Sequence, residues 1–228
     1  MNTSNLTFFF ILLMLPLLPA CTGGASSDVE ADRLPMLGRH DYVEKTVNGQ
    51  TVVDTIYHTV GDFSFVNQDS SQITPATLDG KIYVADFFFT SCPTICPVMK
   101  TQMLRVYEEF KGHPEVALLS HSIDPEYDTV ALLHDYAERL GVSSDTWHFV
   151  TGDKEAIYDI GLSSYMVTAM EDEEEPGGFI HSGAFILVDK DRRIRGMYDG
   201  TEPAQVDKLI KDMNRLLEEY QTKQAAAL

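Results

Sequence analysis

Basic residues are scarce in this chain of 228 residues: Lys and Arg number 17 against 35 Asp and Glu, which gives a formal net charge of −18 at pH 7. Nucleic-acid binding draws its affinity from cationic side chains that neutralise phosphates. The shortage of such side chains therefore excludes DNA and RNA as expected partners. A surface this acidic is most simply a means of staying soluble, and it also favours the approach of cations or of a basic partner.

No apolar run reaches the length of about 20 residues that a membrane-spanning helix needs. The N-terminal run from Phe8 to Leu18 is too short, and Pro16 weakens a helix within it. A short apolar core followed by a small residue is typical of a secretory signal peptide. We therefore predict a signal peptide at residues 1–20, although no Lys or Arg precedes the apolar core.

The end of this segment, Leu18-Pro19-Ala20-Cys21, resembles the lipobox of bacterial lipoproteins, with Pro19 as an unusual residue in it. The resemblance implies cleavage before Cys21 and attachment of lipid to this residue. An uncleaved anchor or a plain secretory signal is the alternative. Residues 21–35 predict a flexible tether. We expect a membrane-anchored lipoprotein of the bacterial cell envelope that faces the periplasm or the exterior.

Cysteine is rare as well, with three residues in the whole chain. Without Cys21, the mature domain keeps only Cys92 and Cys96. Two thiols in an exported protein would normally indicate a disulfide. A bridge across four positions closes a very small loop, however, and so adds little stability. The spacing favours a chemical role over a structural one.

Within residues 36–220, apolar runs alternate with amphipathic stretches, and this pattern predicts one α/β domain. Short strands and a hairpin with an Asn48-Gly49 turn are expected within residues 34–66. The later predicted strands are 82–89, 116–123, 147–150, 184–188 and 193–198. Four helices are predicted. The first runs from the cysteines to Gly112, the second and third cover residues 129–140 and 154–160, and the last begins near Pro203. A loop is expected at 165–179, and residues 221–228 should fray.

This order of elements predicts a thioredoxin-like fold. The fold has N-terminal β-hairpin additions and a further β-hairpin before the C-terminal helix. The run IYVADFFF at residues 82–89 should be its central strand, buried on both faces.

The strongest local signal is the segment Cys92-Pro93-Thr94-Ile95-Cys96-Pro97 between this strand and the next helix. Both sulfurs should lie at a helix N-terminus, where backbone N–H groups and the helix dipole favour thiolates. Such a pair is suited to redox chemistry or to a soft metal ion. Thioredoxin-type oxidoreductases have two residues between their cysteines, whereas three occur here, so dithiol chemistry of that type is less assured.

Three segments together resemble the Sco/SenC family of copper proteins: DFFFTSCPTICPVM at 86–99, SIDPEYDT at 122–129 and FIHSGAFILVDKDRRI at 179–194. The resemblance runs from about residue 57 to residue 217. It implies that copper is held by Cys92, Cys96 and His181. It further implies a role in assembling the dinuclear copper centre of cytochrome c oxidase, by donating copper, by reducing thiols of the acceptor, or by both.

The ligand set agrees with this implication, because thiolates suit Cu(I) and an added imidazole lets the same site accept Cu(II). The partner would be the copper-bearing subunit of cytochrome c oxidase or another copper protein. A metallochaperone of this kind is not expected to be an enzyme. The alternatives are a cell-envelope thiol-disulfide oxidoreductase that uses Cys92 and Cys96 without metal, and a copper-responsive or redox-sensing module.

Other candidate ligands are weaker. His121 lies on the strand after the cysteine helix, and alternation can point it toward the site or away from it. Met99 and Met103 lie four positions apart on an apolar face, which favours core packing. Asp124 is either a turn former before a proline or an acceptor for an imidazole.

The acidic run at 171–175 precedes His181 and is most simply a solvated loop. A weaker hypothesis is that the run attracts a basic partner or slows the release of copper. The remaining histidines, expected on the surface or in packing roles, are His40, His58, His113, His134 and His148.

Overall fold

The computed structural model describes residues 33–172, 174 and 177–226. The predicted signal peptide, Cys21 and most of the predicted tether lie outside these residues. Among the described helices, none combines the length and the apolar character required to cross a membrane.

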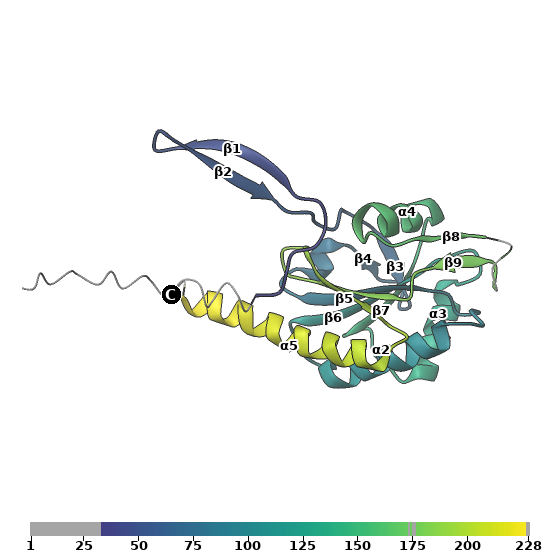
Figure 1. Ribbon diagram of the computed structural model, residues 1–228. Coiled ribbons are helices and arrows are strands. Elements are labelled where there is room, and N and C mark those ends of the chain that lie inside the picture. Colours follow the sequence, from purple (N-terminus) through teal and green to yellow (C-terminus); the bar gives the residue numbers. More distant parts are fainter. Residues whose placement is uncertain (1–32, 173, 175–176, 227–228) are drawn as a thin grey trace, which may run out of the picture. The chain divides into compact units, whose positions relative to one another are not determined.

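The first two strands, β1 (Asp41–Val47) and β2 (Gln50–Ile56), form the predicted hairpin as a two-stranded sheet of their own (Figure 1). Asn48 and Gly49 both have positive φ angles, 52° and 78°, as a two-residue hairpin turn of the primed type requires. Every residue of the two strands except Thr55 is exposed. The hairpin is therefore an appendage that adds nothing to the core.

The core is built on a seven-stranded sheet with the order β11-β10-β5-β6-β7-β3-β4. Its three central strands are parallel, and β10, β11, β3 and β4 pair antiparallel at the two sides. All seven residues of β5 and of β6 are buried, which explains the nearly continuous apolar sequence of β5; β6 is apolar over Val116–Leu119 and ends in the buried polar residues Ser120, His121 and Ser122. The strands are β3 (Phe65–Asn67), β4 (Gln72–Ile73), β5 (Ile82–Phe88), β6 (Val116–Ser122), β7 (Trp147–Thr151), β10 (Ala184–Val188) and β11 (Ile194–Asp199).

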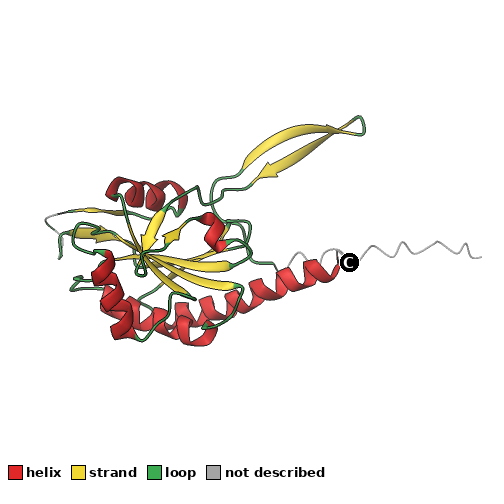
Figure 2. Cartoon of the chain, turned by 180° about the vertical axis from the view of Figure 1, so that it is seen from behind, coloured by secondary structure: helices red, strands yellow, loops and turns green. Residues whose placement is uncertain are grey.

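Helices cover both faces of this sheet, with α2 and α5 on one face and α4 on the other (Figures 1 and 2). The helix α3 starts after Thr129, whose hydroxyl accepts from the N–H of Leu132, and stops at Gly141 with φ 70°. The α-helices are α2 (Cys96–Phe110), α3 (Val130–Leu140), α4 (Lys154–Asp159) and α5 (Pro203–Ala226). A short 3₁₀ helix, η1, spans Pro75–Leu78, and a π-helical turn, η2 (Ile160–Ser164), extends α4.

Two segments differ from the expectation. The predicted loop at 165–179 contains a short strand, β8 (Ala169–Glu171), which pairs antiparallel with β9 (Phe179–His181). The C-terminal helix continues through Ala226, although fraying was expected from residue 221. Its predicted apolar stripe does face the core, where Val206, Leu209, Met213, Leu216 and Leu217 are buried.

Candidate metal centre

The two cysteines lie where the central strand β5 passes into α2. The backbone N–H of Cys92 donates to the carbonyl of Phe89, and this turn directs the chain into the helix. Cys96 is the first residue of α2, followed by Pro97, whose missing N–H is tolerated in a first helical turn. Both residues are buried thiols. Their predicted position at the helix N-terminus is confirmed.

The two thiols are chemically inequivalent. Burial raises the pKa of Cys92, but hydrogen bonds from the Cys96 thiol, from backbone N–H groups and from the Thr94 hydroxyl outweigh it and lower the pKa below the ordinary value. The Thr94 Oγ1 lies 3.6 Å from the Cys92 Sγ. Burial raises the pKa of Cys96 far above the ordinary value, and its hydrogen bond to Cys92 and the nearby Asp86 raise it further. Cys92 is therefore the first of the pair to become a thiolate.

A buried aspartate holds the loop that precedes Cys92. Asp128 is fully buried and accepts hydrogen bonds from the Thr90 N–H at 3.0 Å, from the Thr90 hydroxyl and from the Ser122 hydroxyl at 2.6 Å. These bonds fasten the end of β5 to the end of β6. The neighbouring Asp124 acts as a turn former, because its carbonyl accepts from the N–H groups of Tyr127 and Asp128.

A second buried carboxyl, Asp86, lies on β5 near Cys96. It accepts a hydrogen bond from the Ser120 hydroxyl, which in turn accepts from the Trp147 indole N–H at 2.9 Å. A cavity of about 10 Å³ lies between Asp86, Cys96 and Ser120. Burial raises the pKa of Asp86 to about 7, against a smaller opposing effect of Ser120. Sequence analysis missed this residue, although a lone acid inside an apolar run is a usable signal.

The segment that carries His181 packs against the cysteine loop at several points. The rings of Phe179 and Phe89 lie 4.8 Å apart between centroids. A Cβ on Gly177 would lie 2.9 Å from the Pro93 Cδ, so only glycine fits this close approach. A Cβ on Gly183 would lie 3.7 Å from the Cδ1 of Ile95. Residues on both sides of His181 thus lie close to the motif that contains the two cysteines.

The backbone of His181 belongs to β9 and pairs with Ala169, but its side chain lies outside the described part of the structure. Among the described side chains, no three His, Cys, Asp or Glu residues gather closely enough to hold a metal ion. Cys92 and Cys96 are two of the three predicted ligands. The third, His181, remains a prediction. The contacts of its segment with the cysteine loop support it.

Three of the weaker candidates, His121, Met99 and Met103, lie in the core. His121 is fully buried, its ring stacks on Phe87 with centroids 4.8 Å apart, and its Nδ1 lies 3.3 Å from the carbonyl oxygen of Asp86. Burial lowers the pKa of His121 to about 4, so its imidazole is neutral at pH 7. Met99 and Met103 are also buried, as their helical spacing predicted.

This arrangement suits a soft metal ion. Two thiols at a helix N-terminus form a site in which at least one sulfur readily becomes a thiolate. A histidine from the adjoining strand would complete a Cys₂His set, which is compatible with both oxidation states of copper. Copper would be the cargo of such a site, since three protein ligands leave a coordination position open for transfer.

Comparison with known proteins places the chain in a family. Residues 54–218 match the SCO1/SenC family. A SCO1/SenC family lipoprotein from Bacillus anthracis str. Ames has 29% identity and a TM-score of 0.64, and the match covers 70% of this chain and 95% of that one. Its similarity bears out the thioredoxin-like fold.

Two further solved structures add chemical context. BsSco, described as a member of the Sco family of cytochrome c oxidase assembly proteins with a disulfide switch, has 33% identity, a TM-score of 0.62 and coverage of 70% and 93%. Arabidopsis thaliana ScoI, solved with copper bound, has 26% identity, a TM-score of 0.57 and coverage of 69% and 99%. The chain belongs to the SCO1/SenC family.

Proposed function

We propose that this protein is a copper-binding metallochaperone that assists assembly of the dinuclear copper centre of cytochrome c oxidase. It holds one copper ion through Cys92, Cys96 and His181. The observation that carries the proposal is the packing of the His181 segment on the cysteine loop, through Phe179 on Phe89 and Gly177 on Pro93. The copper bound to the Arabidopsis relative, and the membership of BsSco in a family of cytochrome c oxidase assembly proteins, support it.

The chemistry of the donors supports the same conclusion. Soft sulfur ligands retain Cu(I), and the imidazole adds the borderline nitrogen donor that Cu(II) prefers. The low pKa of Cys92 favours binding, because a thiolate is the form that binds metal. The open coordination position then lets a ligand of the acceptor protein attack the bound ion.

We also propose that Cys21 carries a lipid that anchors the protein to a bacterial membrane, on its periplasmic or outer side. The Leu18-Pro19-Ala20-Cys21 segment supports this location. The Bacillus anthracis relative is itself described as a lipoprotein.

Copper stoichiometry tests the metal site. The wild-type protein should bind one copper per chain, and His181→Ala should lose Cu(II) while the two thiolates still retain Cu(I). His134→Ala is a matched control, because His134 is exposed and lies on α3. A wild-type protein that binds no copper but reduces disulfides would replace the proposal with the metal-free thiol-disulfide oxidoreductase.

A further inference from the structure

The hairpin β1–β2 forms a sheet of its own, and no other strand in the described part of the chain pairs with it. Each of its strands therefore has an open outer edge. Apolar side chains are exposed along both strands; they are Tyr42, Val43, Val47, Val52, Val53 and Ile56. An isolated two-stranded hairpin is at best marginally stable in water, and an open apolar edge strand favours pairing with another chain. The hairpin thus has the properties of an interaction surface.

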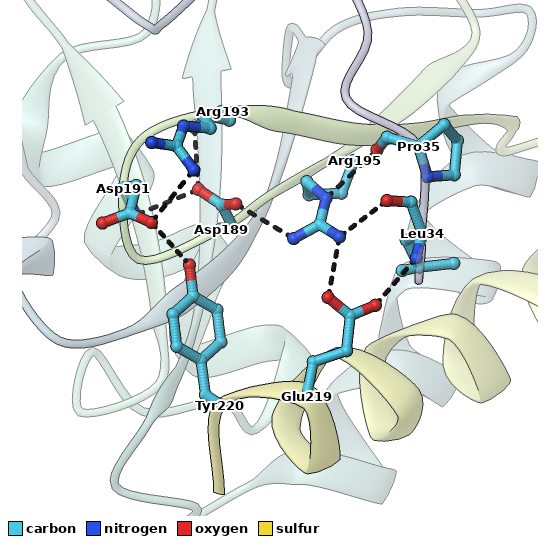
Figure 3. A network of polar contacts seen from close by, with 8 residues as sticks. All are labelled: Leu34, Pro35, Asp189, Asp191, Arg193, Arg195, Glu219 and Tyr220. Carbon is cyan, nitrogen blue, oxygen red and sulfur yellow. Dashed lines mark hydrogen bonds and ion pairs between the residues drawn. The ribbon is translucent and has the colours of Figure 1, made fainter. Parts of the chain in front are cut away.

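The chain that leads into the hairpin is fixed to the core by buried charged groups, as Figure 3 shows. Arg195 on β11 is almost fully buried and pairs with Asp189 at 3.1 Å and with Glu219 of α5 at 2.8 Å. Its guanidinium also donates to the backbone carbonyls of Leu34 at 2.7 Å and Pro35 at 3.1 Å. Removing one partner from such a buried network is strongly destabilising. The entry to the hairpin is therefore held firmly.

The chain that leaves the hairpin is fixed as well. The His58 Nε2 donates to the carbonyl of Ser164 at 2.7 Å, and the Val60 N–H donates to the carbonyl of Arg192 at 2.8 Å. The two ends of the hairpin also meet, because a Cβ on Gly38 would lie 2.6 Å from the Cβ of His58. Only glycine allows this approach, and Gly38 has a φ of 105°. The hairpin is thus a fixed part of the domain.

The backbone groups of β1 alternate between its two edges. A two-residue turn follows Val47, so Val47 and every second residue back to Asp41 form the hydrogen-bonded pairs with β2. The residues between them, Tyr42, Glu44 and Thr46, direct their N–H and carbonyl groups to the outer edge. An added antiparallel strand can bind these groups, and the alternate residues of β1 then form closer, non-hydrogen-bonded pairs with it.

A second copy of the chain fits this edge in one symmetric register. A twofold axis perpendicular to the sheet pairs two copies of β1 antiparallel about a central residue. Lys45 is the only basic residue of β1, and centring on Val43 is the one choice that places an acidic residue, Asp41, directly opposite it. Centring on Glu44 would place two like charges together. The register about Val43 also places Tyr42 opposite Glu44, so that their outward backbone groups pair.

This register brings opposite charges close together. Directly opposed side chains have Cβ atoms about 4.5–5.5 Å apart, and the non-hydrogen-bonded pairs are the closer ones. Asp41 faces Lys45 of the second copy twice, once on each side of the axis. Lys45 already forms an ion pair with Asp54 of its own chain, so the second copy adds another carboxylate beside it. The edge of β2 lacks such complementarity, because Asp54 is its sole charged residue.

We infer that β1 is a dimerisation edge, through which two copies of this chain pair about Val43 into a four-stranded sheet of the order β2-β1-β1-β2. The interface is isologous, so it closes with two copies and covers both β1 edges. Neither the proposed copper ligands nor the proposed lipid at Cys21 enters this inference.

Disulfide trapping tests the register on the full chain in detergent, with diamide as the oxidant. Val43→Cys places two sulfurs opposite each other at the twofold axis. Val52→Cys is the matched control, because Val52 lies on the same face and is similarly exposed, at 47% against 39% for Val43. Two copies of Val52 would lie at least three strand spacings, about 14 Å, apart. Val43→Cys should give several-fold more covalent dimer on a non-reducing gel, and equal yields would overturn the inference.

Exchanging the charges tests the partner. Asp41→Lys and Lys45→Asp each place like charges opposite each other, and each should weaken dimerisation roughly tenfold in sedimentation equilibrium. An equimolar mixture of the two variants should dimerise like the wild type, because the acidic positions of one then face the basic positions of the other. Lys111→Asp makes the same change of charge on another exposed lysine and should have no effect.

Two results would overturn the inference: a wild-type chain that stays monomeric at every concentration, or a mixture that dimerises no better than the single variants. The altered residues are exposed, so urea unfolding of the domain should be unchanged in every variant. Copper stoichiometry of the same variants should also equal that of the wild type, which keeps this test separate from that of the proposed function.

Discussion

The aromatic ring of Phe179 lies 4.8 Å from that of Phe89, so the strand that carries His181 rests directly on the loop that carries Cys92. The two segments that carry the proposed ligands are far apart in the sequence, and this contact joins them. The proposed copper site is therefore preorganised in part, which would reduce the ordering required when copper binds.

Phe179→Ala should weaken copper binding by disordering the His181 segment. An aromatic pair contributes about 0.5–1.5 kcal/mol beyond its buried area, which corresponds to roughly a two- to tenfold increase in Kd. A chelator competition titration measures the change. Phe63→Ala is the control, because Phe63 stacks on Phe65 in another part of the fold. Equal copper affinity in wild type and Phe179→Ala would show that the contact does not support the site.

Asp128→Asn should destabilise the fold and loosen the loop before Cys92. An amide has one acceptor oxygen, whereas the carboxylate of Asp128 accepts from two groups of Thr90 and from Ser122. Loss of a hydrogen bond to a buried charged group costs about 1.5–3 kcal/mol. Urea unfolding measures the loss, with the exposed Asp135→Asn as control. A decrease no larger than that of the control would contradict the assigned role.

The main elements of the fold could be predicted because their sequence patterns are strong. A strand buried on both faces needs an apolar run such as residues 82–89, and the Asn48-Gly49 turn suits the positive φ angles of a tight hairpin. By contrast, β8 and β9 have three residues each, which is too short for a periodic pattern.

The supporting residues of the site were harder to predict than its proposed ligands. Asp128 holds Thr90, which lies 38 positions earlier, and no local pattern encodes that pairing. Asp86 lies within an apolar run, and the pattern of that run predicts a buried strand but no role for the carboxyl group. The two cysteines stood out because their spacing has a local chemical meaning, whereas His181 required the family resemblance.

His121 should make the protein less stable in mild acid. Burial lowers its folded-state pKa to about 4, below the ordinary value of about 6.5. The unfolded chain then binds more protons in this interval, so the stabilisation is complete above pH 6.5 and is lost as the pH falls to 4. The loss from this residue is up to about 3 kcal/mol.

His121→Phe tests this assignment, because phenylalanine fits among the surrounding rings of Phe63, Phe65, Phe87 and Tyr165. The variant should show a smaller decrease in the free energy of unfolding between pH 7 and pH 4 than the wild type. The exposed His134→Phe is the control. An unchanged pH dependence in His121→Phe would mean that His121 is not the titrating group.

Asp86 should have the opposite effect on stability. Burial raises its folded-state pKa to about 7, far above the ordinary value of an aspartate. The folded protein then binds more protons than the unfolded chain between about pH 4 and pH 7, so stability is lost as the pH rises through this interval. The loss amounts to about 4 kcal/mol. Across most of that range it opposes the effect of His121, so the wild-type profile should be flatter than either contribution alone.

Asp86→Asn separates the two effects, because the amide oxygen can still accept from Ser120 but carries no charge. The free energy of unfolding should rise by a few kcal/mol at pH 8 and change little at pH 4, as followed by urea unfolding at both pH values. Asp135→Asn, on the exposed face of α3, should change neither value. A variant that is less stable than the wild type at pH 8 would mean that the charged carboxylate is stabilised in the folded state. Because His121 is unaltered in Asp86→Asn, the variant should also show a steeper loss of stability below pH 6.5, which a general structural defect would not produce.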